Sequence, residues 1–360
     1  MKKKIKVYGI HPSCKDEESF LVCFHITSLQ NNYEFVWDEK NPDYIFVTEM
    51  VYRDAKLKRK FNSFKNNNCI RIFYAGEAVT PDFNIFDYAI GWDADLKNGD
   101  RFGMLPSQFE FANKGFIQSR VNEIKTLEEA KTILKSKTGF CCFLYSNPNA
   151  HPYRDIFFFL LSKYKQVDSL GKHLNNVKNG GGTGFVGHTD ECVDIKSKYK
   201  FSIAFENATF RGYTSEKIYT SLNSHTVPIY WGDPCVTNLI NPKAFINGNN
   251  FNSLDELVEY VKRIDNDDEL WCKMVCEPWM TEDQYELVDK RDSESVDFID
   301  HIFRQDLEAA KRVPVGCHPD CYKENWYDNI PKVLSFFAKV RKKIIMELKF
   351  KGIIRNKVSN

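Results

Sequence analysis

The chain lacks any apolar run long enough to cross a membrane. Its longest such run is IFFFLL at 156–161, far short of the roughly 18–20 apolar residues that a transmembrane helix needs. The opening segment, MKKKIKVYGI, also contains too short an apolar stretch for a secretory signal. Because the 11 cysteines are not accompanied by an export signal, we expect reduced thiols and a cytoplasmic protein.

The chain also lacks a large net charge and the usual phosphate-binding motifs. The formal net charge is only +1, which argues against a globally basic nucleic-acid binder, so we expect no nucleic-acid partner. The chain has no Walker-type loop and no G-x-G-x-x-G directly after an expected strand. A nucleotide, if one binds, must be held by a different arrangement of the backbone and side chains.

The cysteines do not follow the spacing of a zinc ribbon. Two C-x-x-x-C pairs occur, Cys272/Cys276 and Cys317/Cys321, with His318 beside the second pair. A zinc ribbon uses C-x-x-C pairs instead. We therefore favour cysteines on helix faces or in loops, and zinc binding by these two pairs remains open as the alternative.

The chain does contain alternating strand-like and helix-like segments. Apolar runs predict strands at 5–10, 33–38, 44–50, 70–77 and 86–93, and helical spacing predicts helices at 55–65 and 123–136. The segment 139–146 then begins a second alternating series. These patterns predict an α/β protein with domains at 1–136 and 137–318, followed by a basic helical tail at 319–360.

The stretch 201–234 reads as a strand, a polar loop, a helix and a second strand. FSIAFEN at 201–207 is apolar enough for a buried strand, and TVPIYWG at 226–232 predicts the next one. Gly212 permits a sharp turn, and Thr214 is the expected helix cap. The whole unit has the size of a βαβ crossover, which implies a parallel sheet.

Polar side chains gather at the junction between that strand and that helix. Tyr213 and Lys217 lie beside the expected start of the helix. In open α/β sheets, ligands bind beyond the carboxyl ends of the strands, and a helix N-terminus attracts phosphate. A hydroxyl, a cation and a helix terminus together indicate a binding site for a diphosphate.

This stretch resembles the signature of the α1,3/α1,4-fucosyltransferases. The resemblance rests on Phe-Glu-Asn at 205–207, Gly-Tyr at 212–213, Ser-Glu-Lys at 215–217 and Val-Pro-Ile-Tyr-Trp-Gly at 227–232, and Ser215 stands where the family usually has Thr. The resemblance implies the GT-B architecture, in which two Rossmann-like α/β/α domains face each other across a cleft. It further implies that the N-terminal domain binds the sugar acceptor and the C-terminal domain binds GDP-fucose.

The resemblance also points to a general base. An inverting transfer needs one group that removes the acceptor hydroxyl proton. Glu77, in YAGEAVTPDFN, directly follows an expected strand and matches the family's Tyr-x-Gly-Glu context, so the resemblance assigns it as the catalytic base. The competing interpretation is a surface glutamate at a turn.

The remaining predicted site residues would hold the donor. Arg154 offers a guanidinium fork to two phosphate oxygens, although it could instead pair with Asp155. Lys217 would supply a second cation. By resemblance, Asn207 and Tyr213 contact the diphosphate and ribose, and Glu216 contacts the fucose hydroxyls and stabilises positive charge on the sugar ring.

We expect no obligatory metal or other cofactor. Two Asp-x-Asp triplets occur, at 93–95 and 265–267, and such pairs bind a divalent ion in metal-dependent transferases. Three-residue patterns are weak, however. Arg154, Lys217 and the helix N-terminus would already supply the positive charge that a metal provides.

The last part of the chain is strongly basic. Residues 331–360 contain nine Lys/Arg and one Glu, a net charge of +8, with apolar residues at helical spacing between the cations. Residues 332–360 could therefore lie on the anionic inner face of the cytoplasmic membrane. The alternative is a final helix that packs across both domains.

These observations lead to one functional hypothesis and two alternatives. We expect an α1,3-fucosyltransferase that transfers L-fucose from GDP-fucose, with inversion, to the N-acetylglucosamine of a Galβ1,4GlcNAc unit in a bacterial lipopolysaccharide or capsule. The first alternative is a metal-dependent glycosyltransferase that uses another nucleotide sugar and the carboxylates of Asp93 and Asp95. The second alternative is a non-catalytic glycan-binding protein at the membrane surface.

Overall fold

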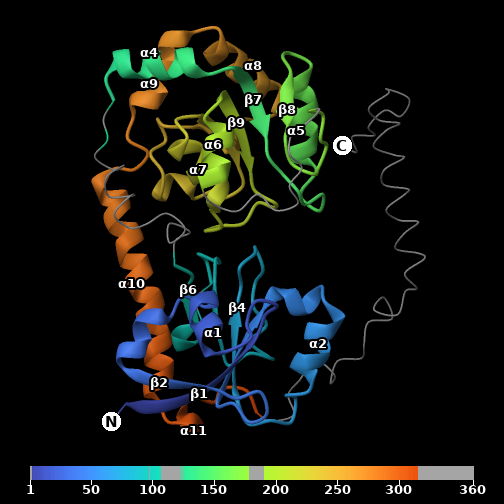
Figure 1. Cartoon of the computed structure of the whole chain (residues 1–360), viewed down its shortest axis with the longest axis vertical. Coiled ribbons are helices and arrows are strands. Elements are labelled where there is room, and N and C mark those ends of the chain that lie inside the picture. The colour runs from blue at the N-terminus through green and yellow to red at the C-terminus, as the bar shows by residue number, and fades with distance from the viewer. Residues whose placement is uncertain (1, 97, 107–122, 124, 178–189, 315–360) are drawn as a thin grey trace, which may run out of the picture.

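The computed structural model describes residues 2–96, 98–106, 123, 125–177 and 190–314. Cys317, His318, Cys321 and the basic tail lie outside these residues. The described chain forms two halves, each built around a parallel β-sheet, and helix α10 (Glu282–Arg304) runs along one side from the second half to the first (Figure 1).

Six parallel strands form the first sheet. Their order is β2-β1-β3-β4-β5-β6, with bounds β1 (Lys3–Ile10), β2 (Tyr33–Trp37), β3 (Tyr44–Thr48), β4 (Ile70–Tyr74), β5 (Tyr88–Gly91) and β6 (Phe102–Met104). The central strands β3, β4 and β5 are buried along their whole length, as a parallel sheet covered on both faces requires. The five strands predicted for this region are confirmed, and β6 was missed because three residues are too few to show a pattern.

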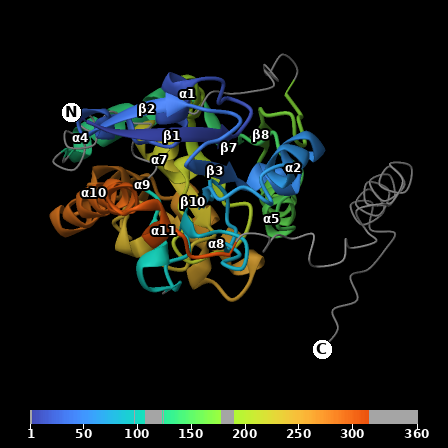
Figure 2. The same cartoon turned by 90° about the horizontal axis from the view of Figure 1, so that it is seen from below.

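Alternate residues of these strands pack on opposite faces of the sheet. Tyr44 and Phe46 belong to the cluster that also holds α1 (Glu17–Cys23) and the end of α10, whereas Ile45 and Val47 pack with α2 (Ala55–Asn62). Figure 2 accordingly shows α10 and α2 on opposite sides. This alternation follows from the two-residue period of a strand.

Five parallel strands form the second sheet. Their order is β11-β10-β9-β7-β8, with bounds β7 (Gly139–Phe143), β8 (Val167–Ser169), β9 (Tyr199–Phe205), β10 (Val227–Trp231) and β11 (Ile246–Asn247). The surrounding helices are α4 (Leu127–Ser136), α5 (Tyr153–Ser162), α6 (Asp190–Lys196), α7 (Glu216–Asn223), α8 (Leu254–Asp265) and α9 (Asp268–Cys276). The predicted βαβ unit is confirmed, because β9, α7 and β10 follow one another and β9 pairs with β10 in parallel.

Helix α10 joins the two halves through its two ends. Val288, near its start, is buried with the second sheet, whereas Ile302 and Phe303 are completely buried against the first sheet. The Phe303 ring lies 4.9 Å from the Tyr44 ring, centroid to centroid. The short helix α11 (Leu307–Ala310) then continues on the first half.

The packing does not follow the expected boundary at residue 136. Helix α4 was expected to close the N-terminal domain, but its completely buried Ala130 lies in the hydrophobic cluster of the second sheet. The end of α10, which was assigned to the second domain, packs on the first. Amphipathic spacing shows that a helix has a buried face, but it does not show which sheet that face covers.

No helix within the described residues is both long enough and apolar enough to span a membrane.

Candidate active site

The site is built around the buried carboxylate that follows strand β9. Glu206 is completely buried, and it accepts hydrogen bonds from the Ser215 backbone N–H at 2.8 Å and the Ser215 hydroxyl at 2.7 Å. Its Oε2 atom also lies 3.0 Å from the Lys217 ammonium group. The carboxylate therefore fixes the loop before α7 and the cation within the first turn of that helix.

The electrostatics of this pair keep Lys217 charged. Burial alone would lower the pKa of Lys217, but the carboxylates of Glu206 and Glu216 raise it well above its ordinary value. Burial raises the pKa of Glu206, and Lys217 and the hydrogen bonds from Ser215 oppose that shift. Glu216 contributes a more accessible carboxylate, with its Oε1 atom 3.6 Å from the Lys217 ammonium and a quarter of its side chain exposed.

The expected cap of α7 was wrong by one residue. Ser215 is the N-cap, and its hydroxyl bonds to Glu206 instead of capping the helix. Thr214 donates to the Asp233 carboxylate at 2.9 Å. The first turn of α7 is therefore held by two buried acids, Glu206 and Asp233, which follow strands β9 and β10.

Gly212 lies at a close contact between the two halves. Its φ of +91° lies in the region that favours glycine, and a Cβ there would lie 2.2 Å from the backbone oxygen of Trp92 in the first half. The Gly212 N–H donates to Asp233 at 2.9 Å, and the neighbouring Arg211 pairs with Asp95 at 2.5 Å. Both the backbone conformation and the close approach therefore require glycine.

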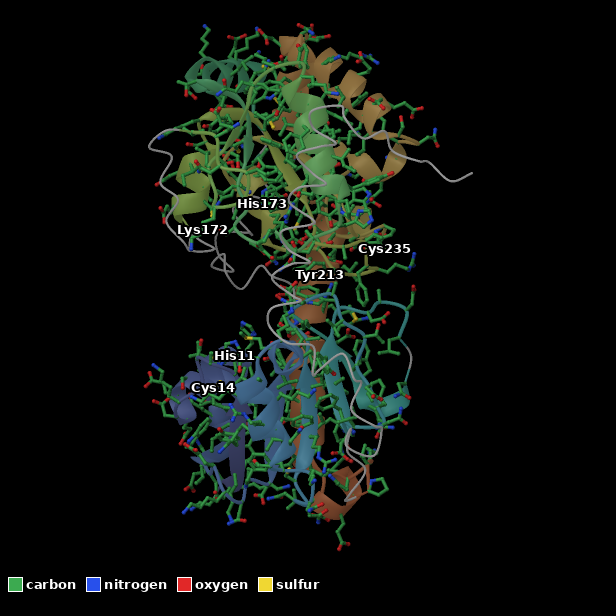
Figure 3. The ribbon with its side chains drawn as sticks, turned by 90° about the vertical axis from the view of Figure 1, so that its right-hand side faces the viewer. His11, Cys14, Lys172, His173, Tyr213 and Cys235 are labelled. Atoms are coloured by element: carbon green, nitrogen blue, oxygen red, sulfur yellow. The ribbon has the colours of Figure 1, made fainter. Side chains whose placement is uncertain are left out.

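Glu77 of the first half meets two predicted donor-site residues of the second. Its Oε2 atom accepts from the Tyr213 hydroxyl at 3.1 Å and lies 3.4 Å from the Asn207 side-chain nitrogen. Figure 3 shows Tyr213 between the two halves. The structure thus brings together three of the predicted site residues, which are separated by up to 136 positions in the chain.

Arg154 joins this group from the start of α5. Its guanidinium donates to the Asn147 backbone oxygen at 2.6 Å, lies 3.4 Å from the Asn207 side-chain oxygen and stacks 4.4 Å from the centre of the Tyr145 ring. The competing contact with Asp155, at 3.5 Å, is longer than the bond to Asn147. Arg154 is completely buried, so these partners hold the guanidinium beside Asn207 before any ligand binds.

Two further features of the site were missed by sequence reasoning. Glu49, at the end of β3, is buried and accepts from the Gly76 N–H at 3.0 Å, which fixes the residue before Glu77. Burial raises the pKa of Glu49, and the charge of Glu77 adds to the shift. A signal was present, because Glu49 follows an expected strand in the same way as Glu77.

The second missed feature is a group of rings beside Asn207. The His151 and Tyr153 rings lie 5.0 and 5.3 Å from the Trp231 ring, and both side chains are exposed. The His151 backbone N–H donates to the Asn207 backbone oxygen at 2.7 Å. These rings are tilted relative to one another and offer an aromatic surface close to the predicted diphosphate-binding residues.

The two Asp-x-Asp triplets have structural partners. Asp95 pairs with Arg211, and Asp93 accepts from the Thr80 hydroxyl at 3.1 Å. Asp265 pairs with Lys165 and Lys200, and Asp267 caps α9. These contacts account for the carboxylates through ion pairing and helix capping.

The arrangement is that of a GT-B glycosyltransferase: two parallel-sheet halves face each other, with acidic groups and the predicted donor-binding residues near the carboxyl ends of their strands. A solved crystal structure of an α1,3-fucosyltransferase with GDP-fucose matches with a TM-score of 0.60 and 26% identity, covering 85% of this chain and 92% of that chain.

Sequence comparison identifies the family. Residues 134–315 match glycosyltransferase family 10 (fucosyltransferase) C-term, and residues 17–109 match the alpha-(1,3)-fucosyltransferase FucT N-terminal domain. The chain belongs to glycosyltransferase family 10.

Curated relatives carry different linkages in their names. The alpha-(1,3)-fucosyltransferase FucT of Helicobacter pylori is 34% identical over 233 residues, which is 57% of this chain and 45% of the relative. The alpha-(1,4)-fucosyltransferase of Arabidopsis thaliana is 34% identical over 137 residues, 34% of each chain. The match thus spans less than half the length of each of these relatives.

The buried pair can be tested by a double-mutant cycle. Glu206→Gln should lower the free energy of unfolding by about 3–5 kcal/mol, because Lys217 would remain without its closest counter-charge. Adding Lys217→Met removes the second charge and should recover a large part of that loss. Urea unfolding followed by circular dichroism measures both effects. Lys217→Met alone completes the cycle, and a loss in the double variant equal to the sum of the two single losses would show that the two side chains are not coupled.

Proposed function

We propose that this chain is an α1,3-fucosyltransferase that transfers L-fucose from GDP-fucose, with inversion, to N-acetylglucosamine in a Galβ1,4GlcNAc-type surface glycan. The observation that carries the proposal is the contact of Glu77 with Asn207 and Tyr213. This contact joins a carboxylate of one half to two residues of the other half that we propose to bind the donor. An acceptor hydroxyl bound by the first half would then lie between the base and the fucose.

We assign a different task to each oxygen of Glu77. Asn207 and Tyr213 both contact Oε2, so we assign Oε1 to the acceptor proton. Removal of that proton lets the acceptor oxygen attack the anomeric carbon while the bond from that carbon to GDP breaks. Inversion follows because attack and departure occur on opposite faces of the sugar.

The second half would stabilise the departing GDP. Lys217 and Arg154 carry the positive charge that the diphosphate needs as it gains negative charge. Glu216, the more exposed acid beside Lys217, would face the positive charge on the fucose ring. The rings of His151, Tyr153 and Trp231 would accommodate the guanine base by stacking.

We further propose that transfer needs no metal, because these cations and the start of α7 already balance the diphosphate charge. The metal-dependent alternative would require Asp93 and Asp95 to leave their present partners. A chelator in the assay separates these alternatives, and an assay with disaccharide acceptors and product-linkage analysis separates α1,3 from α1,4 transfer.

The base assignment gives a direct prediction. Glu77→Gln should retain GDP binding but lower the transfer rate by about 100-fold or more, because an amide cannot accept the acceptor proton at neutral pH. GDP-release kinetics with GDP-fucose and an N-acetyllactosamine acceptor measure the rate. Glu18→Gln, an exposed carboxylate of the same half, is the control and should leave the rate unchanged. A near-normal rate for Glu77→Gln would exclude this mechanism, whereas a wild type without transfer activity would favour the glycan-binding alternative.

The donor site gives a second prediction. Arg154→Lys, which keeps the charge but loses the fork, and the double variant Glu206→Gln/Lys217→Met should each weaken GDP binding about 10-fold or more through lost charge-assisted hydrogen bonds. Titration calorimetry with GDP measures the affinity. Lys163→Ala, at the far end of α5, is the matched control because it removes an exposed cation. Unchanged affinity in both test variants would mean that GDP binds elsewhere.

The basic tail is the basis of a third prediction. Helix α10 already packs across both halves, so that role does not require residues 332–360. We propose that these residues hold the protein at the inner face of the cytoplasmic membrane, since each cation near an anionic surface contributes about 1 kcal/mol. Deleting them should abolish salt-sensitive co-sedimentation with anionic vesicles and leave activity on soluble acceptors intact. Unfolding or aggregation of the truncated chain would instead support packing of the tail on the core.

A further inference from the structure

A histidine and two cysteines converge at the end of strand β1. His11 follows the strand, Cys14 lies in the next turn and Cys23 ends helix α1. Figure 3 shows His11 and Cys14 at the end of the first half that faces the second. Among the residues that the structure describes, this is the group of three or more His, Cys, Asp or Glu side chains whose possible ligand atoms all lie within 4.8 Å of one another.

The spacing of these atoms is close to what a tetrahedral metal site requires. Zinc bonds of about 2.3 Å to sulfur and about 2.1 Å to nitrogen place tetrahedral S and N ligands roughly 3.6 Å apart. The Cys23 sulfur lies 3.8 Å from Nδ1 of His11. All three ligand atoms lie within 4.8 Å of one another, and Nδ1 of His11, which accepts from the Ser13 N–H at 3.2 Å, would exchange that hydrogen bond for the ion.

The backbone holds the three residues in place without an ion. The Cys14 N–H donates to the His11 backbone oxygen at 3.1 Å, which closes the turn, and a Cβ on Gly9 would meet the Cys14 sulfur at 2.9 Å. Asp16 and Ser19 form a capping box that starts the helix ending at Cys23. Ligands fixed in this way lose little conformational entropy when a metal binds.

We propose that His11, Cys14 and Cys23 form a binding site for a zinc-class divalent ion, with three protein ligands and a fourth position for water or another ligand. Two thiolates and an imidazole select such ions over magnesium, calcium or manganese, which prefer oxygen ligands.

The site is separate from the proposed transfer chemistry. Strand β1 is two positions from β4 in the sheet order β1-β3-β4, and Glu77 follows β4. At the usual strand spacing the two sites are roughly 10 Å apart along the same edge. The ion would fix the loop after β1 on the acceptor side, and its binding neither requires nor replaces the donor-site cations.

Cobalt(II) tests this proposal because thiolate ligands give it an intense near-ultraviolet charge-transfer band and tetrahedral coordination gives visible d–d bands. The full chain, reduced with a phosphine and freed of metal, is titrated with cobalt and then with zinc. We expect one cobalt ion per chain with thiolate bands that zinc abolishes. Cys14→Ser/Cys23→Ser should remove the bands, and His11→Ala should weaken cobalt binding by on the order of 100-fold.

Matched variants separate this site from the other cysteines. Cys317→Ser/Cys321→Ser and Cys235→Ser should both keep the bands. Absence of a thiolate band in the reduced wild type, or a band that survives Cys14→Ser/Cys23→Ser, would overturn the proposal. If that double variant misfolds, His11→Ala decides, because it keeps every thiol, and unchanged cobalt affinity in this variant would exclude the site. A Cys14–Cys23 disulfide found by peptide mapping after purification without oxidant would also overturn it, in favour of a redox pair.

Discussion

Glu206 is completely buried, yet it accepts two hydrogen bonds from Ser215 and lies against the ammonium group of Lys217. A carboxylate without partners in such a place would be strongly destabilising. The loop at 207–215 must therefore fold back, so that Ser215 and the first turn of α7 lie against the end of β9. The folded loop positions Tyr213 toward the other half. It also holds Lys217 in the first turn of α7, where the helix dipole alone would disfavour a cation.

The same loop determines how the halves meet. Gly212 lies so close to Trp92 that a side chain would not fit, and Tyr213 next to it packs its ring 5.4 Å from the Trp92 ring. Helix α10 supports this contact from the side, because Arg291 donates to the Leu105 backbone oxygen at 2.7 Å and lies 5.3 Å from the centre of the Trp92 ring. Packing at Trp92 therefore helps to hold Tyr213 where its hydroxyl reaches Glu77.

Much of the fold could be predicted from the sequence, because apolar strands in a parallel sheet are local patterns. Five of the six strands of the first sheet and the unit from β9 to β10 were found in this way. The packing of α4 on the second sheet and of the end of α10 on the first could not be predicted. An amphipathic pattern shows only that one face of a helix is buried. Glu206 is part of the sequence motif. Its burial and its hydrogen bonds with Ser215 could not be predicted, because they form only when the loop folds back against the end of β9.

The predicted site residues also differ in whether the local sequence is enough to select them. Glu77, Arg154, Asn207, Tyr213, Glu216 and Lys217 were selected because they match the family's motifs, and most of them lie near the end of a strand or the start of a helix, where side chains meet at one edge of a sheet. Glu49 has a similar position but matches no motif, and its relation to Glu77 appears only when β3 and β4 are paired. His11 and Cys14 have a comparable position after β1, and their partner Cys23 arrives from a helix. The carboxyl edge of the first sheet thus carries two neighbouring sets of chemical groups. One set, around Glu77, depends on the second half for its partners, whereas the other, around His11, is complete within the first half and can act as a binding site without interdomain contact.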